Sequence, residues 1–230
     1  MTALAVAGVL LFALLGRWQW HRADEKRALE AAYAAGGAEF ASDLGDRSIA
    51  AMPRYAQVRM HGRYDAGHQF LLDNMSHGGR AGYQVLTPFR LDDGRVVLVN
   101  RGWVPLPDGR RDRLPDLSLP ETGEINLGGR LDELPAAAIA AGNAPPSPDD
   151  TWPKRTSFPT SAQLGAALGQ GIEGRQLLLG EAEPNGYVRD WHEAMIGFPP
   201  ERHVAYAAQW WALATLVGFL YLYLNLEWRS

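Results

Sequence analysis

The residues best suited to chemistry in this 230-residue chain lie near its C-terminal end, around His203. On a helix, His203 shares a face with Tyr206 and Trp210, three and seven positions later. Arg202 directly precedes it. An imidazole nitrogen can ligate haem iron, aromatic rings can cover the macrocycle, and an arginine can pair with a propionate. These residues are therefore a candidate haem site; the alternative is an interfacial histidine that hydrogen-bonds lipid headgroups.

The element that must position this histidine is an uncharged run from His203 to Leu226, which contains no Asp, Glu, Lys or Arg. As a helix it would extend about 36 Å, enough to cross a hydrocarbon core of about 30 Å with some tilt. Trp210 and Trp211 near one end, and Trp228 beyond the other, suit the two membrane interfaces. We expect a transmembrane helix over 203–226 rather than a buried helix of a large soluble protein.

A second apolar run, Ala3 to Leu15, becomes long enough to span when the helix continues through Trp20. There Arg17 can reach the interface. No basic stretch precedes this run, and the helical pattern continues past Gly16 without an A-x-A site, which favours an uncleaved anchor over a cleaved signal peptide. We therefore expect a first transmembrane helix over 3–20. The composition of residues 21–35 favours a helix that continues from it as a polar stalk.

The central residues have the period of two that is typical of strands. The clearest hairpin pairs Gly82–Leu91 with Arg95–Val104 around an Asp93-Gly94 turn, with a nearly all-apolar central strand after it. Other expected elements are paired strands at 55–64 and 68–73, strands at 124–131 and 176–180, a helix at 160–168, a linker at 41–53 and a long loop at 134–159. The predicted fold is an α+β membrane protein, with two transmembrane helices flanking an antiparallel β-rich extramembrane domain over 21–202.

Other motifs are incomplete. The GxGxxG stretch at 169–174 lacks the preceding strand and following helix of a dinucleotide site, and His192-Glu193 lacks the second histidine of HExxH. His61, His68 and His77 could form a loose metal cluster, but scattered surface histidines are the simpler interpretation.

Bulk composition excludes several further classes. The chain has no cysteine, hence no thiolate site or disulfide. Its net charge of −4 predicts no nucleic-acid partner. A mean hydropathy of −0.21 excludes a polytopic membrane protein.

Four groups of residues, in order along the chain, resemble the Surfeit locus protein 1 family. They are Leu15-Gly16-Arg17-Trp18-Gln19 with Arg22 and Lys26; Gly62-Arg63-Tyr64-Asp65 with Asp73-Asn74, Gly82-Tyr83 and Thr87-Pro88; Val99-Asn100-Arg101-Gly102-Trp103-Val104-Pro105; and the HxxYAxQW pattern from His203 to Trp210. The resemblance covers both ends and the middle of the chain.

This resemblance implies an inner-membrane assembly factor for cytochrome c oxidase, not an enzyme, with two spans and the domain on the periplasmic side. It further implies delivery of haem a to the oxidase catalytic subunit, with His203 as the proposed ligand and haem A synthase as a possible further partner. A scaffold that stabilises an assembly intermediate without binding haem is the alternative, and a membrane-anchored enzyme is disfavoured.

The basic residues favour the opposite topology. Arg17, Arg22, Lys26 and Arg27 all follow the first span, which by the positive-inside rule would leave the domain in the cytoplasm. Long domains translocate largely regardless of charge, so we expect the topology that the resemblance implies.

Overall fold

A computed structural model of the chain describes residues 2–38, 42–120, 123–136, 142–192 and 198–226. The chain divides into two compact units. The helical unit comprises Met1–Ala32 and Met195–Ser230, and the sheet unit comprises Tyr33–Ala194.

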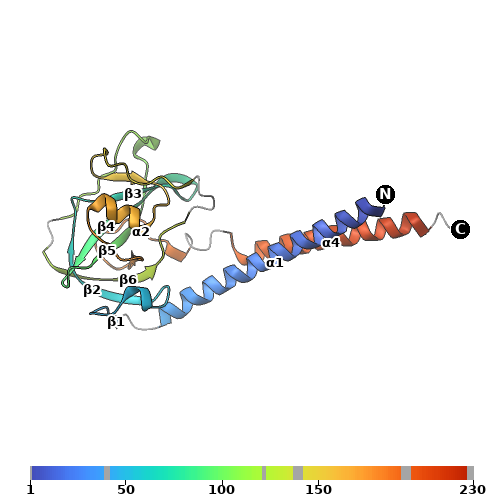
Figure 1. Ribbon diagram of the computed structural model, residues 1–230, viewed down its shortest axis with the longest axis horizontal. Helices are drawn as coiled ribbons and strands as arrows, with labels where there is room; N and C mark the ends of the chain where they lie inside the picture. The colour runs from blue at the N-terminus through green and yellow to red at the C-terminus, as the bar shows by residue number, and fades with distance from the viewer. Residues whose placement is uncertain (1, 39–41, 121–122, 137–141, 193–197, 227–230) are drawn as a thin grey trace. The chain divides into compact units, whose positions relative to one another are not determined.

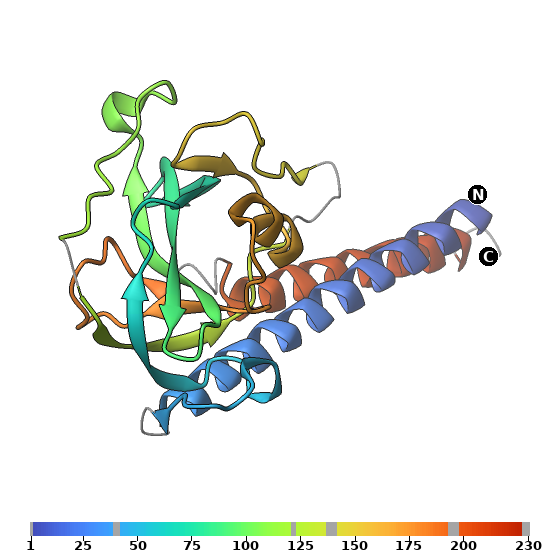
Figure 2. The ribbon, with the colours of Figure 1, turned by 60° about the vertical axis from the view of Figure 1, so that its left-hand side comes forward.

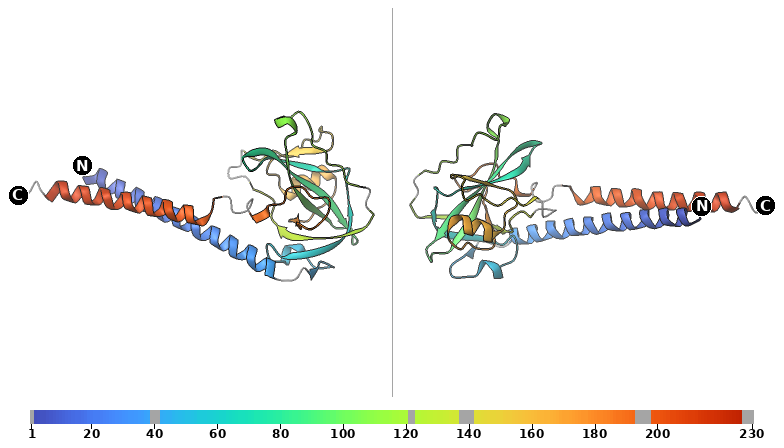
Figure 3. Two further views of the ribbon diagram at one scale, coloured as in Figure 1. Left: turned by 180° about the vertical axis from the view of Figure 1, so that it is seen from behind. Right: turned by 45° about the horizontal axis from the view of Figure 1, so that its top comes forward.

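The helical unit consists of two long helices, α1 (Thr2–Ala38) and α4 (Pro200–Leu226), which lie side by side (Figures 1 and 3). Helix α1 runs without interruption from the first apolar run through the predicted polar stalk, and its last residues belong to the sheet unit. Helix α4 begins three residues before His203. By length and composition, both helices could cross a membrane.

The sheet unit is built on one eight-stranded sheet. Its strands are β1 (Ser42–Asp43), β2 (Gln57–Tyr64), β3 (Phe70–His77), β4 (Arg80–Leu91), β5 (Val96–Pro105), β6 (Ile125–Asp132), β7 (Lys154–Thr156) and β8 (Gln176–Leu179). Their order is β1-β2-β6-β8-β5-β4-β3-β7. Parallel pairings join β1 to β2, β3 to β7 and β5 to β8. The sheet is therefore mixed, and the expectation of an antiparallel sheet was wrong.

An additional pairing between β2 and the end of β4 closes five strands into a small barrel, β2-β6-β8-β5-β4 (Figure 2). Closure removes the exposed edges that these strands would otherwise present. Strand β5 lies between β8 and β4, and all its residues except Pro105 are buried. This burial on both faces explains its nearly continuous apolar sequence and confirms it as a central strand.

Several local predictions are confirmed. Strands β4 and β5 form the expected hairpin, with Gly94 in the left-handed region at φ 85°. Strands β6 and β8 lie where strands were expected, as does helix α2 (Ser161–Leu168). A capping box between Thr160 and Gln163 starts α2, and Gly169 ends it in the left-handed conformation. The GxGxxG stretch thus begins at the end of a helix, which a dinucleotide site would not allow.

Other predictions need correction. Strands β2 and β3 do not pair with each other, because both pair with β4: β3 along its first part and β2 at its end. The expected linker at 41–53 contains β1 and the short 3-10 helix η1 (Ile49–Ala51). The expected loop at 134–159 contains β7, although its residues 137–141 lie outside the described part of the chain. A second short helix, η2 (Pro107–Gly109), follows β5.

Three groups of buried apolar side chains hold the sheet unit together, of which two bear on the barrel and on helix α2. The larger group includes residues from all five barrel strands: Val58, Met60, Phe89, Leu91, Val97, Val99, Leu127, Leu131, Leu177 and Leu179. On another face of β3, β4 and β5, Leu164 of α2 packs against Phe70, Leu72, Leu86 and Leu98. The regular alternation of these side chains into the interior is what the strand period required.

Candidate functional site

His203 is the fourth residue of α4, and its ring is half-buried against α1. Its Nδ1 lies 2.8 Å from Oε1 of Gln19. An amide oxygen can only accept a hydrogen bond, so the ring donates from Nδ1. In the neutral ring this leaves the lone pair on Nε2, the nitrogen that is available to a metal.

Small residues allow the two helices to approach each other beside this hydrogen bond. On α4, Ala207 is fully buried, and on α1 Gly16 and Ala23 are buried. A Cβ atom added at Gly16 would lie 2.3 Å from Nε1 of Trp211, which is closer than real atoms come. A larger residue at position 16 would therefore force the ring of Trp211, or the two helices, to move apart.

The other predicted site residues, Arg202, Tyr206 and Trp210, differ in their exposure and in their contacts. Trp210 stacks on Phe12 of α1, with ring centroids 5.6 Å apart, so one face of its ring is already covered. Tyr206 is exposed on α4. Arg202 is also exposed, and its guanidinium lies over the ring of Phe198 at 5.2 Å. Phe198 in turn contacts His203, with ring centroids 6.3 Å apart.

This arrangement would allow His203 to hold a haem iron through Nε2. Histidines that ligate metals almost always donate their other ring N–H to a fixed oxygen acceptor, as His203 does to Gln19. Leu213 and Leu216 provide exposed apolar surface further along α4. Among the described residues, no group of three or more His, Asp or Glu side chains could hold a metal ion. Haem iron held by one imidazole does not need such a group.

Three other histidines each contact a different aspartate. His61 lies 2.6 Å from Asp92, His68 lies 2.8 Å from Asp65, and His77 lies 3.3 Å from Asp190. Each contact accounts for its own histidine, and the structure does not bring the three together into a metal site. The HExxH fragment extends into residues 193–196, which lie outside the described part of the chain.

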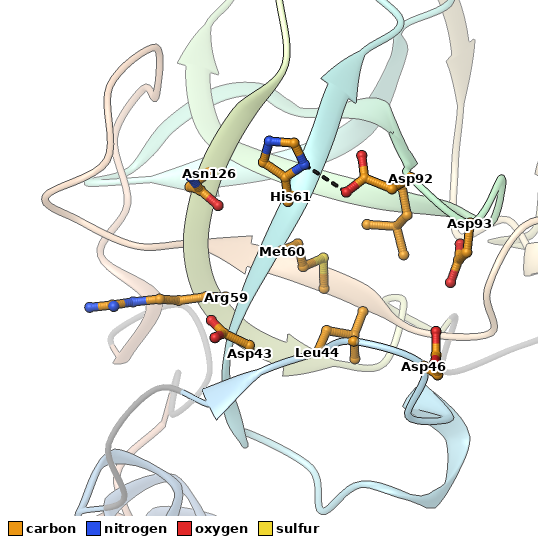
Figure 4. A pocket seen from close by; sticks show the side chains of 11 residues that line it. Asp43, Leu44, Asp46, Arg59, Met60, His61, Asp92, Asp93 and Asn126 are labelled. Carbon is orange, nitrogen blue, oxygen red and sulfur yellow. Dashed lines mark hydrogen bonds and ion pairs between the residues drawn. The ribbon is translucent and has the colours of Figure 1, made fainter.

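A hollow of about 380 Å³ opens beside β2, next to the β4–β5 turn (Figure 4). Its lining is acidic and includes Asp43, Asp46, Asp92 and Asp93. Asp92 accepts a hydrogen bond from His61, and this bond raises the pKa of His61. Asp93 forms an ion pair with Arg95. Turn geometry and these pairings account for the adjacent aspartates of the β4–β5 turn.

A buried arginine lies in β5. Arg101 is 2 % exposed; its Nε donates to Asn185 O at 2.8 Å, and one terminal nitrogen donates to Gln69 Oε1 at 3.0 Å. The guanidinium also lies over the ring of Tyr187 at 4.8 Å. Burial lowers the pKa of Arg101. Its contacts attach two loops to β5, which makes it a structural residue.

Sequence reasoning proposed His203 as a haem ligand and assigned no role to Gln19. The two residues are 184 positions apart, and only the antiparallel packing of α1 and α4 brings them together. The signal that could have found Gln19 is a polar side chain at the end of an apolar run, where a hydrogen-bond partner is needed.

Comparison with protein families finds a match over most of the chain. The SURF1 family model matches residues 6–215, a segment that includes both Gln19 and His203. No curated protein matches the chain.

Proposed function

Because the chain belongs to the SURF1 family, a family of cytochrome c oxidase assembly factors rather than catalytic enzymes, we propose that it hands haem a to the oxidase catalytic subunit. His203 is the ligand to the haem iron in this proposal. The observation that carries it is the hydrogen bond from Nδ1 of His203 to Gln19, which leaves Nε2 available. Haem a is cargo here, received from haem A synthase and released to the oxidase.

Other residues of the helical unit complete the proposed site. Arg202 is exposed beside His203 and can meet a propionate, without a charge entering the bilayer. Tyr206 and the uncovered face of Trp210 offer aromatic surface to the macrocycle. Leu213 and Leu216 can accept an apolar tail at little cost in lipid.

The test of haem binding is His203→Ala in the full chain, purified in detergent with an affinity tag that contains no histidine. Alanine favours helix, so the protein should still accumulate in the membrane. We expect the wild type to copurify with haem, the variant to lose its Soret band, and oxidase activity to fall in a deletion strain complemented with it. His21→Ala is the matched control, because His21 contacts Arg17 on α1 and not His203. An unchanged spectrum and full oxidase activity in His203→Ala would reject the proposal.

For location, we propose the bacterial inner membrane, with residues 21–202 in the periplasm and both termini in the cytoplasm. Asp108 is exposed in η2 and tolerates a reporter fusion better than a strand would. Alkaline phosphatase should be active when fused at Asp108 and inactive when fused at Ser230. The reverse pattern would place the domain in the cytoplasm, as the basic residues after the first span suggest.

The second candidate is a scaffold that steadies a partly built oxidase without binding haem. The observation that favours it is the extent of outward-facing apolar surface on both helices, from Leu4 and Leu10 on α1 to Phe219 and Leu224 on α4. Partner helices in the membrane could cover that surface. A wild-type protein without haem, together with full oxidase activity in His203→Ala, would favour this function.

A further inference from the structure

We infer that Gln19 is a positioning residue that holds His203 in the tautomer with the proton on Nδ1, so that Nε2 is the nitrogen presented to haem iron. The inference rests on the proposed function for its consequence, but the hydrogen bond itself is a property of this chain. A neutral imidazole carries one proton and can place it on either nitrogen. A fixed acceptor at one nitrogen decides which tautomer is populated.

The packing of α1 restricts the position of the acceptor, the side-chain amide of Gln19. Gln19 lies on the same face of α1 as Gly16 and Ala23, three positions before it and four after it. Gly16 is buried with the ring of Trp211 of α4 directly beside it, so the backbone of α1 near Gln19 is close to α4. The side chain of Gln19 is itself half-buried, which limits the freedom of the amide to turn toward water.

Gln19 is not needed to hold the two helices in register. At the far end of the pair, Tyr221 donates from its hydroxyl to Thr2 Oγ1 at 2.9 Å. Between the two ends, Phe12 stacks on Trp210, and Trp20 contacts Trp211 with ring centroids 5.8 Å apart. The helices therefore keep several contacts without the amide, and its specific effect is on the imidazole proton.

The opposite tautomer would change the site. With the proton on Nε2, the lone pair would point from Nδ1 toward Gln19, and the nitrogen available for iron would carry a hydrogen. Binding would then require the proton to move first. An outer-shell partner of a metal-ligating histidine is typically worth about 10–100-fold in affinity, and this is the size of effect we expect.

The experiment compares Gln19→Leu, Gln19→Glu and the wild type as full chains in detergent micelles, labelled with ¹⁵N in the histidine rings. Gln209→Leu is the matched control, since it makes the same change at an exposed position on α4. His203→Ala identifies the His203 signals by their loss. The first measurement is the pair of ring ¹⁵N shifts of His203 at a pH where the ring is neutral and without haem; the second is haem affinity by titration.

We expect Gln19→Leu to move the His203 shifts away from the Nδ1–H pattern and to weaken haem binding by about 10–100-fold. Gln19→Glu keeps an acceptor and should retain the Nδ1–H pattern and binding. Gln209→Leu should change neither. If Gln19→Leu leaves the ¹⁵N shifts unchanged, the inference is wrong, whatever happens to haem. If the shifts change as expected but the wild type binds no haem, tautomer control by Gln19 stands and the proposed function fails.

Discussion

The two units of this protein use the same kinds of apolar side chain in opposite ways. In the sheet unit the large ones point inward, as Phe89 does with 0 % of its surface exposed. In the helical unit many of them point outward, as Phe219 does with 63 % exposed, and the residues buried between the helices include the small Gly16 and Ala207. The inward pattern of the sheet unit removes apolar surface from water. The outward pattern of the helical unit leaves apolar surface exposed, which suits an apolar environment such as lipid.

Different forces must therefore stabilise the two units. Burial of apolar area contributes about 25 cal/mol per Å² to a core such as that of the barrel. Between helices in lipid this term is absent, and close packing and hydrogen bonds replace it. The polar contacts differ in the same way. Arg101 is enclosed in the sheet unit by several acceptors, whereas His203 pairs with Gln19 between the two helices.

The clearest test of this difference between the two units is to remove one tryptophan side chain from each and compare the loss of stability. Trp103 of β5 is 7 % exposed and contacts His77, and Trp18 of α1 is 58 % exposed. Trp103→Ala should cost about 3–5 kcal/mol of folding free energy because it leaves a cavity. Trp18→Ala should change the stability of the sheet unit by less than about 0.5 kcal/mol. Urea unfolding of the full chain in detergent, followed by circular dichroism in the β region, measures both.

Loss of Trp103 should deplete the folded protein rather than leave it folded and inactive. Wild-type levels and wild-type unfolding in Trp103→Ala would mean that this ring is a surface contact. Equal losses for both variants would mean that the two units do not differ in the way their side chains suggest.

A smaller effect should follow from filling the contact between the helices. Gly16→Leu forces a side chain into the ring of Trp211 and should cost about 1–3 kcal/mol of helix association. Gly218→Ile should be milder, since a Cβ there meets Val9 at an ordinary 3.9 Å. Because the chain has no native cysteine, a Gly8→Cys/Val217→Cys pair can report association by cross-linking.

The added Cβ of position 8 lies 3.8 Å from Cγ1 of Val217, so this pair should cross-link efficiently in the otherwise native chain. Gly16→Leu should reduce the cross-linked fraction more than Gly218→Ile does. The reverse order would show that the helices pack with a different register from the observed one.

What could be predicted from the sequence was mostly local. The Asp93-Gly94 turn and the apolar run of β5 identify the central hairpin, because a tight turn joins strands that are neighbours in the chain. The capping residues around α2 are equally local. Closure of the barrel by β2 and β4 depends on pairing between distant segments, for which the sequence carries no turn signal.

The same distinction explains the failures. The Asp65-Ala66-Gly67 segment has turn residues and predicts a β2–β3 hairpin, yet β4 is long enough to pair with β3 along one part and β2 at its end. Strand β7 has three residues, too few to display a period. At the candidate site, His203 could be chosen for its chemistry, but its partner Gln19 depends on how two distant helices pack.

The smallest expected effect concerns the surface of the sheet unit, where an exposed ion pair should contribute far less than the buried core. The hydrogen bond to Asp92 raises the pKa of His61, so folding favours the protonated ring. The stabilisation is fully present below the pKa of the unfolded chain, about 6.5, and is lost as the pH rises through the higher folded value. Asp92→Asn should therefore lower the melting temperature slightly at pH 5 and not at pH 9.

Asp46→Asn, in the same hollow, is the control and should leave the His61 titration unchanged when followed by NMR. A His61 pKa that is the same in wild type and Asp92→Asn would show that solvent screening cancels even this contact.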